Sequence, residues 1–197
     1  DVERSRGLGD VYKRQEKGSG AGNNENYDEM IYEGYAAGGV AVVIEAMTDN
    51  KNRTAGDIRS YFTKFNGNLG ETGCVGWMFD KKGCITFNKD DVDYEKLFEA
   101  AINLDAEDIV EEDDEYKVYT SIPNLQPVAE GLEAEGFKST SAEFTRIPQN
   151  TIEVTDEKTA INIMRLLGRL EEHDDVQNVY ANFDIDDSLM EKIEASL

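Results

Sequence analysis

The chain has 197 residues, and its 42 Asp and Glu against 20 Lys and Arg give a formal net charge of −22. Apolar residues make up 39%, which is enough for a folded core. No run of apolar residues reaches the roughly 18 that a transmembrane helix needs, and two cysteines are too few for a disulfide-stapled secreted domain. We therefore expect a cytoplasmic protein whose overall field does not attract nucleic acid.

The first residues need separate treatment. Ser5–Gln15 reads as the in-frame translation of a widely used transposon sequencing adapter, so we expect residues 1–15 to be a library artefact. Residues 16–26 are rich in Gly and Asn and predict a linker. Its Gly18–Gly22 segment superficially resembles a nucleotide loop, but the flanking strand and helix that such a loop requires are not predicted.

The next segment predicts a strand, a helix and a hairpin. Gly39–Thr48 is a β-branched apolar run typical of a buried strand, and Asp49–Arg53 predicts a polar turn. Thr54 and Asp57 resemble a capping box, and Gly67 predicts the end of the helix. The apolar face of that helix consists of Ile58, Tyr61, Phe62 and Phe65.

Two cysteines lie in the hairpin predicted from Cys74–Phe79 and Cys84–Phe87, with the turn at residues 80–83. In that register the two cysteines are offset by about five residues along the strands. They would lie roughly 16 Å apart, because a strand rises roughly 3.3 Å per residue. This separation exceeds the reach of a disulfide, so we expect two free thiols.

Residues 89–150 differ in composition, with 17 acidic and 5 basic residues. Apolar spacing predicts two helices, the second beginning after Asn124, and alternating patterns predict three strands. The strands are expected at Ala106–Glu112, Tyr116–Ile122 and Lys138–Ile147. The helices are expected from two apolar sets, Tyr94, Leu97, Phe98, Ala101 and Ile102, and Leu125, Val128, Ala129 and Leu132.

After Pro148 the pattern predicts a long helix capped by Thr155 or Asp156, a strand over Val176–Ile185 and a short helix over Ser188–Leu197. Together the outer pieces give the order β-α-β-β-α-β of a ferredoxin-like α+β domain. We therefore expect residues 27–88 and 151–197 to form one discontinuous domain. Residues 89–150 would be an inserted acidic α+β domain, with residues 151–154 as the candidate for its missing strand.

The sequence offers little for catalysis. His173 is the only histidine and stands in an acidic run, which favours a solvated helix end over a general base. The acidic residues 111–115 lack the alternating ligands and the glycine of a calcium-binding loop. We expect no enzyme activity, no metal, no cofactor and no small-molecule substrate.

Six cations within residues 48–82 stand out in this acidic chain: Lys51, Arg53, Arg59, Lys64, Lys81 and Lys82. Their predicted positions, at a strand–helix turn, on the polar side of a helix and at a hairpin tip, leave their charges free to meet phosphates. Ordinary surface charge is the alternative explanation of the same pattern.

Three motifs resemble the signature of the YebC/PmpR family: residues 33–41, 48–54 and 67–79. Ala36-Ala37, Lys51 and Cys74 depart from the residues usual in that family, which are Gly-Pro, Arg and Ser. The matching positions are Gly38, Gly39, Thr48, Asp49, Asn50, Asn52, Arg53, Thr54, Gly67, Asn68, Leu69, Gly70, Gly73, Met78 and Phe79.

The resemblance implies a non-enzymatic regulator of gene expression with a basic helical N-terminal domain. We expect that domain to be almost wholly missing here, with residues 16–20 as its last residues and residues 16–26 as its remnant or a linker. Family members are described as DNA-binding transcriptional regulators. Others, including the mitochondrial translational activator of cytochrome c oxidase, act in translation, and some associate with ribosomes to assist elongation. We expect the six cations to contact DNA or ribosomal RNA, and the acidic inserted domain to face away or to meet a basic protein. No membrane partner is expected.

Overall fold

The computed structural model describes residues 26–197, so the predicted adapter segment and nearly all of the predicted linker lie outside the described residues. The described chain divides into two compact units. Residues 26–79 and 148–197 form the outer unit, and Asp80–Ile147 form the inserted unit. The sequence had suggested divisions at 88/89 and 150/151. The divisions differ because residues 83–88 pair with a strand of the inserted unit.

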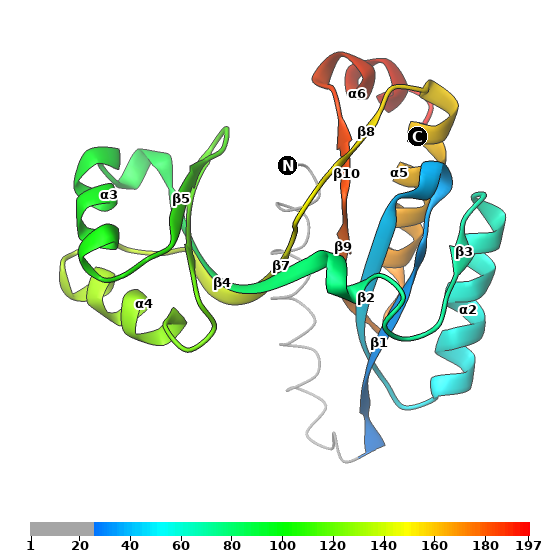
Figure 1. The fold of residues 1–197 in the computed structure, drawn as a ribbon, viewed down its shortest axis with the longest axis horizontal. Helices are drawn as coiled ribbons and strands as arrows, with labels where there is room; N and C mark the ends of the chain where they lie inside the picture. Colours follow the sequence, from blue (N-terminus) through cyan, green and yellow to red (C-terminus); the bar gives the residue numbers. More distant parts are fainter. Residues whose placement is uncertain (1–25) are drawn as a thin grey trace. The chain divides into compact units, whose positions relative to one another are not determined.

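An antiparallel sheet of order β3-β1-β2-β9 organises the outer unit (Figure 1). A separate parallel pair joins β8 to β10. The strands are β1 (Asp28–Tyr35), β2 (Ala41–Thr48), β3 (Asn68–Leu69), β8 (Ile152–Val154), β9 (Val176–Ala181) and β10 (Phe183–Ile185).

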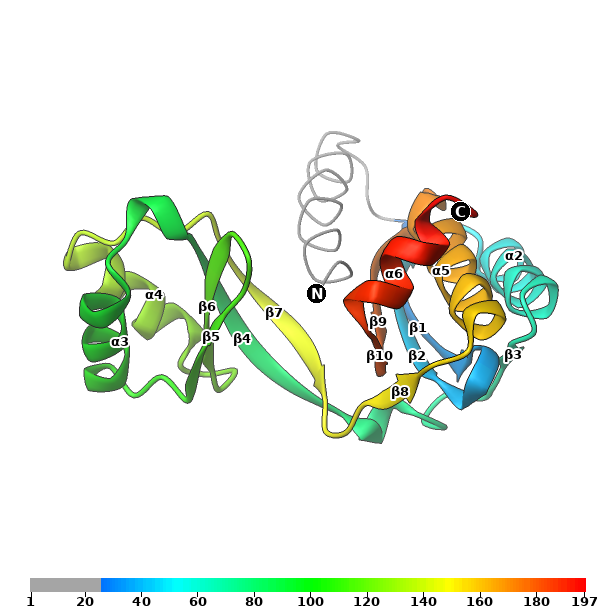
Figure 2. The same cartoon turned by 90° about the horizontal axis from the view of Figure 1, so that it is seen from above.

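Two long helices lie side by side on one face of this sheet, α2 (Lys51–Lys64) and α5 (Glu157–Glu172) (Figures 1 and 2). A third helix, α6 (Asp187–Glu194), packs against α5. Apolar side chains repeat every three or four residues on both long helices, and this spacing buries one face of each against the sheet. The core between them includes Val42, Ile44, Ile58, Phe62, Ile163, Leu166 and Leu170.

The predicted ferredoxin-like order is wrong, although the α+β class holds. β1 was not predicted, and it pairs with β2 as a hairpin through the 3-10 turn η2 (Ala37–Gly39), so the unit begins β-β-α-β. Gly38 and Gly39 adopt φ of +75° and +79° in this turn, a region that glycine enters without strain. β1 escaped detection because it has one aliphatic residue, Ile31, and three acidic ones.

The predicted hairpin at residues 80–83 is also wrong. β4 (Phe79–Asn88) is one continuous strand, and residues 74–78 form a loop that ends in η3 (Gly76–Met78). Cys74 and Cys84 are not joined in a disulfide, as predicted, although the register used to argue their separation does not exist.

α2 begins earlier than predicted, because Asn50 rather than Thr54 is its N-cap and accepts a hydrogen bond from the backbone N–H of Arg53. The predicted turn over 49–53 therefore ends at Asn50. At the other end Asn66, with φ of +61°, takes the left-handed position expected for Gly67. Gly67 is required for a different reason: a Cβ there would lie 2.7 Å from the backbone oxygen of Tyr35.

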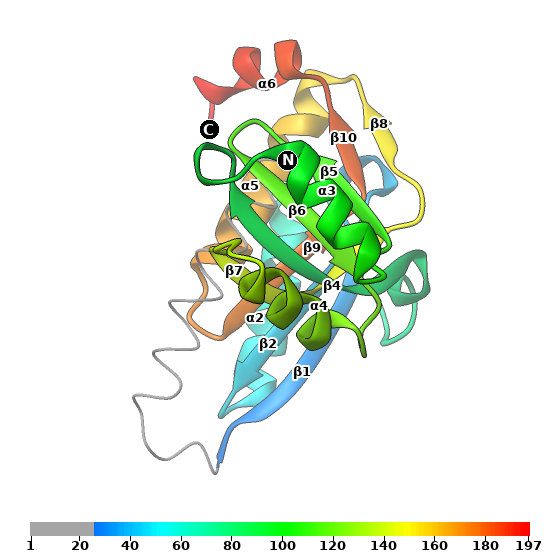
Figure 3. The same ribbon diagram turned by 90° about the vertical axis from the view of Figure 1, so that its left-hand side faces the viewer.

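The inserted unit has a sheet of order β5-β6-β4-β7 with two helices on one face (Figure 3). Its predicted helices and strands are confirmed, each within a few residues. They are α3 (Tyr94–Asn103), β5 (Asp108–Glu111), β6 (Glu115–Thr120), α4 (Leu125–Ala134) and β7 (Ser141–Pro148), with the 3-10 turn η4 (Lys89–Asp91) before α3. Its core includes Ile85, Phe87, Leu97, Val118, Val128 and Leu132.

Two details after residue 148 differ from the prediction. Residues 152–154 do not complete the inserted sheet, because β8 pairs with β10. The predicted strand over Val176–Ile185 is divided at Asn182, whose side-chain oxygen accepts a hydrogen bond from the Ala41 backbone N–H at 2.8 Å. The long helix begins after Asp156, one of the two predicted caps.

Candidate nucleic-acid interface

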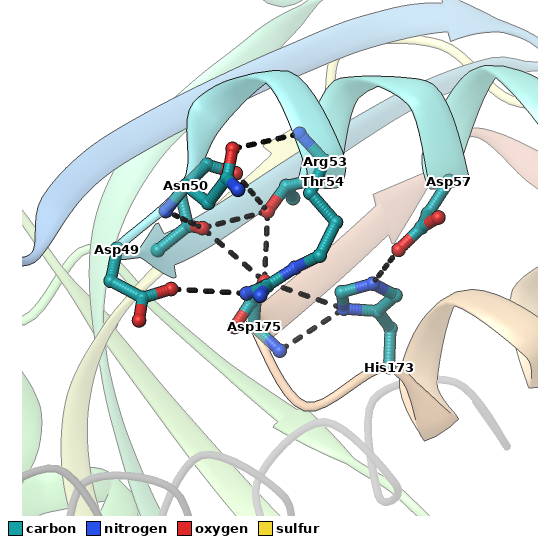
Figure 4. Close-up of polar contacts among 8 residues, drawn as sticks. Asp49, Asn50, Arg53, Thr54, Asp57, His173 and Asp175 are labelled. Carbon is teal, nitrogen blue, oxygen red and sulfur yellow. Dashed lines mark hydrogen bonds and ion pairs between the residues drawn. The ribbon is translucent and has the colours of Figure 1, made fainter.

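A buried polar network holds the N-terminus of α2 in place (Figure 4). The Thr54 hydroxyl lies 2.8 Å from Asp175 Oδ2 and 2.7 Å from Thr48 Oγ1. Thr48 closes β2, and its hydroxyl accepts a hydrogen bond from the Asn50 backbone N–H at 3.0 Å. Both threonines are fully buried. Their hydrogen bonds to Asp175 join this part of the 48–54 motif, and with it α2, to the loop before β9.

Arg53 completes this network instead of standing free. Its Nη2 lies 3.0 Å from Asp49 Oδ1 and 3.3 Å from Asp175 Oδ2. The hydrogen bond to Asp175 is the main reason that the pKa of Arg53 is raised, with its charge and then that of Asp49 adding to the effect. Two carboxylates therefore compensate this guanidinium, and a phosphate would have to compete with them.

His173 is not the solvated helix end that the sequence suggested, because its side chain is only 10% exposed. Its Nδ1 accepts a hydrogen bond from the Asp175 backbone N–H at 3.1 Å. That bond places the ring proton on Nε2, which donates to Asp57 Oδ2 at 2.9 Å (Figure 4). The imidazole thus links the end of α5 to the middle of α2, and its edge meets the Tyr61 ring.

Arg53 is itself 52% exposed, and the other three cations predicted on α2 are also exposed. Lys51 makes a long contact, 3.8 Å, with the equally exposed Asp28. The Lys64 ammonium lies 5.6 Å from the centre of the Phe65 ring. Arg59 lies beside buried Ile58 in the sequence but points away from the core. With four cations and one carboxylate, α2 carries a net charge of +3 in an acidic chain.

Sequence reasoning missed Arg169 on α5. Its guanidinium carbon lies 5.8 Å from the centre of the Tyr61 ring, so it joins the surface of α2. Arg165, one turn earlier, donates instead to the backbone oxygen of Ser196 at 2.7 Å. The four-residue spacing of Arg165 and Arg169 is visible in the sequence, but the packing of α5 beside α2 is not.

Lys81 and Lys82 lie on β4 and belong to the inserted unit. Lys82 Nζ pairs with Glu107 Oε2 at 2.5 Å, whereas Lys81 is exposed. They do not occupy a hairpin tip, and they belong to a different unit from α2.

Other residues of the three motifs support the sheet on which α2 packs. Glu33 is only 4% exposed, and its carboxylate accepts hydrogen bonds from the backbone N–H groups of Gly73, Val75 and Gly76. Gly34 allows β3 to approach β1, because a Cβ there would lie 2.7 Å from the Asn68 oxygen.

These contacts fold the 67–79 motif over the sheet face opposite α2. Gly70 lies where a Cβ would meet the Cys74 sulfur at 2.7 Å, and Asn68 and Leu69 form β3. Asn52 is exposed on the first turn of α2. The loop's apolar residues pack on Ala41 and Val43, in a cluster that contains Val75, Phe79, Cys74 and Met78.

Within residues 26–197, no group of three or more His, Cys, Asp or Glu side chains is arranged to hold a metal ion. No helix in the same range is both long and apolar enough to cross a membrane.

Comparison with known proteins identifies the family. A family profile, the TACO1/YebC second and third domain, matches residues 27–183. A probable transcriptional regulatory protein of Geobacter sulfurreducens is 55% identical over 177 residues, which cover 90% of this chain and 71% of that protein. One of Desulfotalea psychrophila is 51% identical with the same coverage.

A solved structure is similar in sequence and fold. The crystal structure of a conserved hypothetical protein from Aquifex aeolicus is 45% identical, with a TM-score of 0.78. The match covers 82% of this chain and 67% of that one. The chain therefore belongs to the TACO1/YebC family.

Proposed function

We propose that this protein regulates gene expression without catalysing a reaction, and that it binds nucleic acid through the exposed cations of α2 together with Arg169. Its relatives are named as probable transcriptional regulatory proteins, which supports a role in gene expression. One observation carries the choice of surface. α2 concentrates three exposed cations, Lys51, Arg59 and Lys64, in a chain whose net charge is −22.

The chemistry of these side chains favours contact with phosphates over reading of bases. Lys and Arg on an exposed helix face neutralise backbone charge and position a protein on nucleic acid. α2 packs against the sheet through Ile58 and Phe62, and within residues 26–197 we find no helix-turn-helix arrangement that would place it in a major groove.

Transcriptional regulation is the function that the relatives' names support, and in that role the proposed surface would contact DNA. Association with ribosomes is the second candidate, because a surface that reads phosphate and shape suits structured RNA. The two candidates predict different binding partners in a cell lysate, DNA for the first and ribosomal particles for the second. One experiment therefore separates them.

The experiment is sedimentation of the tagged chain from a cell lysate on a sucrose gradient, with and without nuclease. Its variants are K51A/R59A/K64A and the matched control K96A/K138A/K158A, which removes three exposed cations elsewhere. Migration with ribosomal particles that is lost on RNase treatment and in the α2 variant, but kept in the control, would support the translation role.

Migration only at the top of the gradient, with retention on DNA that the α2 variant loses, would support the transcription role. Equal behaviour of the two triple variants in both assays would overturn the assignment of α2 as the interface.

A further inference from the structure

Helix α3 of the inserted unit carries an apolar stripe that its own core does not use. Tyr94, Phe98 and Ile102 are 37%, 44% and 48% exposed. Their spacing of four residues places them in one row along about 12 Å of the helix. The sequence predicted one apolar face that held this row together with Leu97 and Ala101. The structure buries Leu97 and Ala101, with Ala100, and leaves the row exposed.

Neighbouring rings fix the start of this row. The Tyr94 ring lies 5.1 Å from the Tyr116 ring and 6.0 Å from the Phe98 ring, measured between centres. The rings touch each other while one side stays open to solvent. A partner would therefore meet an ordered surface and would lose little side-chain entropy on binding.

Acidic residues border the stripe. Glu95 and Glu99 are exposed, and each follows a stripe residue by one position, which places both about 100° further round the helix. Asp91 and Asp93 are exposed just before the helix. The inserted unit as a whole has 18 acidic and 7 basic residues, a net charge of −11.

We propose that the α3 stripe, defined as Tyr94, Phe98 and Ile102, is a docking surface for a basic amphipathic helix of another protein. The apolar row would receive side chains at helical spacing, as in helix-in-groove recognition. The acidic border would pair with Lys or Arg on the partner and disfavour acidic partners. A second copy of this chain is a poor occupant, because two units of net charge −11 would face each other.

This surface lies in a different unit from α2, so the proposal does not depend on the nucleic-acid role. The probe is a fluorescent synthetic helix of Leu and Lys of about 18 residues, or five turns. A peptide in which Glu replaces every Lys serves as the charge control. Binding to the full chain is measured by anisotropy, with sedimentation velocity of the protein alone in parallel.

The test compares F98S/I102S with the matched variant I122S/F144S. The matched variant removes two exposed apolar side chains, 37% and 61% exposed, from the same unit. We expect the stripe variant to weaken binding of the Lys peptide at least about tenfold and the matched variant by less than about twofold. A second pair, E95Q/E99Q against E130Q/E133Q, tests the acidic border in the same way.

Three results would overturn the proposal. The first is equal weakening by the stripe variant and its matched control, and the second is equally tight binding of the Glu peptide. The third is self-association of the wild type that F98S/I102S abolishes, which would make a second copy the occupant. The α2 triple variant should bind the Lys peptide like the wild type.

Discussion

The buried network at the start of α2 makes a quantitative prediction for Asp175→Ala. This change removes the acceptor that lies 2.8 Å from the Thr54 hydroxyl and 3.3 Å from the Thr48 hydroxyl. Both hydroxyls are fully buried, and a buried donor without its partner costs about 1–3 kcal/mol. Because the two hydroxyls can still bond each other, we expect the outer unit to lose about 2–4 kcal/mol of unfolding free energy.

A double-mutant cycle isolates the contact. Thr54→Val alone should cost about 1–3 kcal/mol, because it removes the hydroxyl while keeping the shape. In the Asp175→Ala background it should cost about 1–2 kcal/mol less, since its main partner is already gone. Asp184→Ala is the matched control: this exposed carboxylate lies in the same unit and should change stability by less than about 0.5 kcal/mol.

Urea unfolding followed by tryptophan fluorescence measures these changes in the outer unit, which contains both substituted residues. Trp77 is the only tryptophan of the chain and belongs to the outer unit. Additive effects of the two substitutions, within about 0.5 kcal/mol, would refute the network as the support of α2. A loss in Asp184→Ala as large as that in Asp175→Ala would refute the role of burial.

Other predictions follow from the same structure. Glu33→Gln should raise the reaction rate of Cys74 with a thiol reagent severalfold. The pKa of that thiol is raised first by burial and then by the charge of Glu33, and the loop would also loosen. An unchanged rate would contradict this. Gly67→Ala should cost about 1–3 kcal/mol in urea unfolding, since its Cβ would strike a backbone oxygen. The pKa of Asp156 is lowered by Thr159, and that of Asp186 by Ser188. Each cap therefore contributes stability that is complete above its unfolded pKa and is lost as pH falls below about 3.8. The variant D156N/D186N should lose less stability than the wild type between pH 5 and 3 in acid titrations followed by circular dichroism, and parallel curves would contradict the capping argument.

Local periodicity was enough to predict most helices and several strands. α5 and the elements of the inserted unit follow apolar repeats that the sequence shows directly. β1 was missed because it has one aliphatic residue among eight, and its absence from the prediction produced the wrong ferredoxin-like order. The hairpin was wrongly placed because Gly83 suggested a turn, whereas Gly83 lies within β4 and pairs with Thr120 of β6.

The candidate site was only partly predictable, because its key contacts join distant parts of the chain. Thr54 resembled a helix cap, but its partner Asp175 lies 121 residues away. The Asp175 carboxylate also pairs with Arg53, which the sequence analysis placed among the cations free to meet phosphates. Arg169 was missed because its neighbour Tyr61 lies on another helix, and only the packing of α5 against α2 brings them together.

The central claim is that exposed cations of α2 contact nucleic-acid phosphates, and the salt dependence of binding tests it most directly. The dissociation constants of the wild type, K51A/R59A/K64A and K96A/K138A/K158A are measured for a DNA duplex and a ribosomal RNA stem-loop over a range of salt concentrations. Each lost phosphate contact should lower the slope of log K against log salt by about 0.7–0.9. The account predicts that the α2 variant loses up to about 2–3 units of slope on the nucleic acid it binds, while the control keeps the wild-type slope. Equal slopes for the wild type and the α2 variant would contradict it.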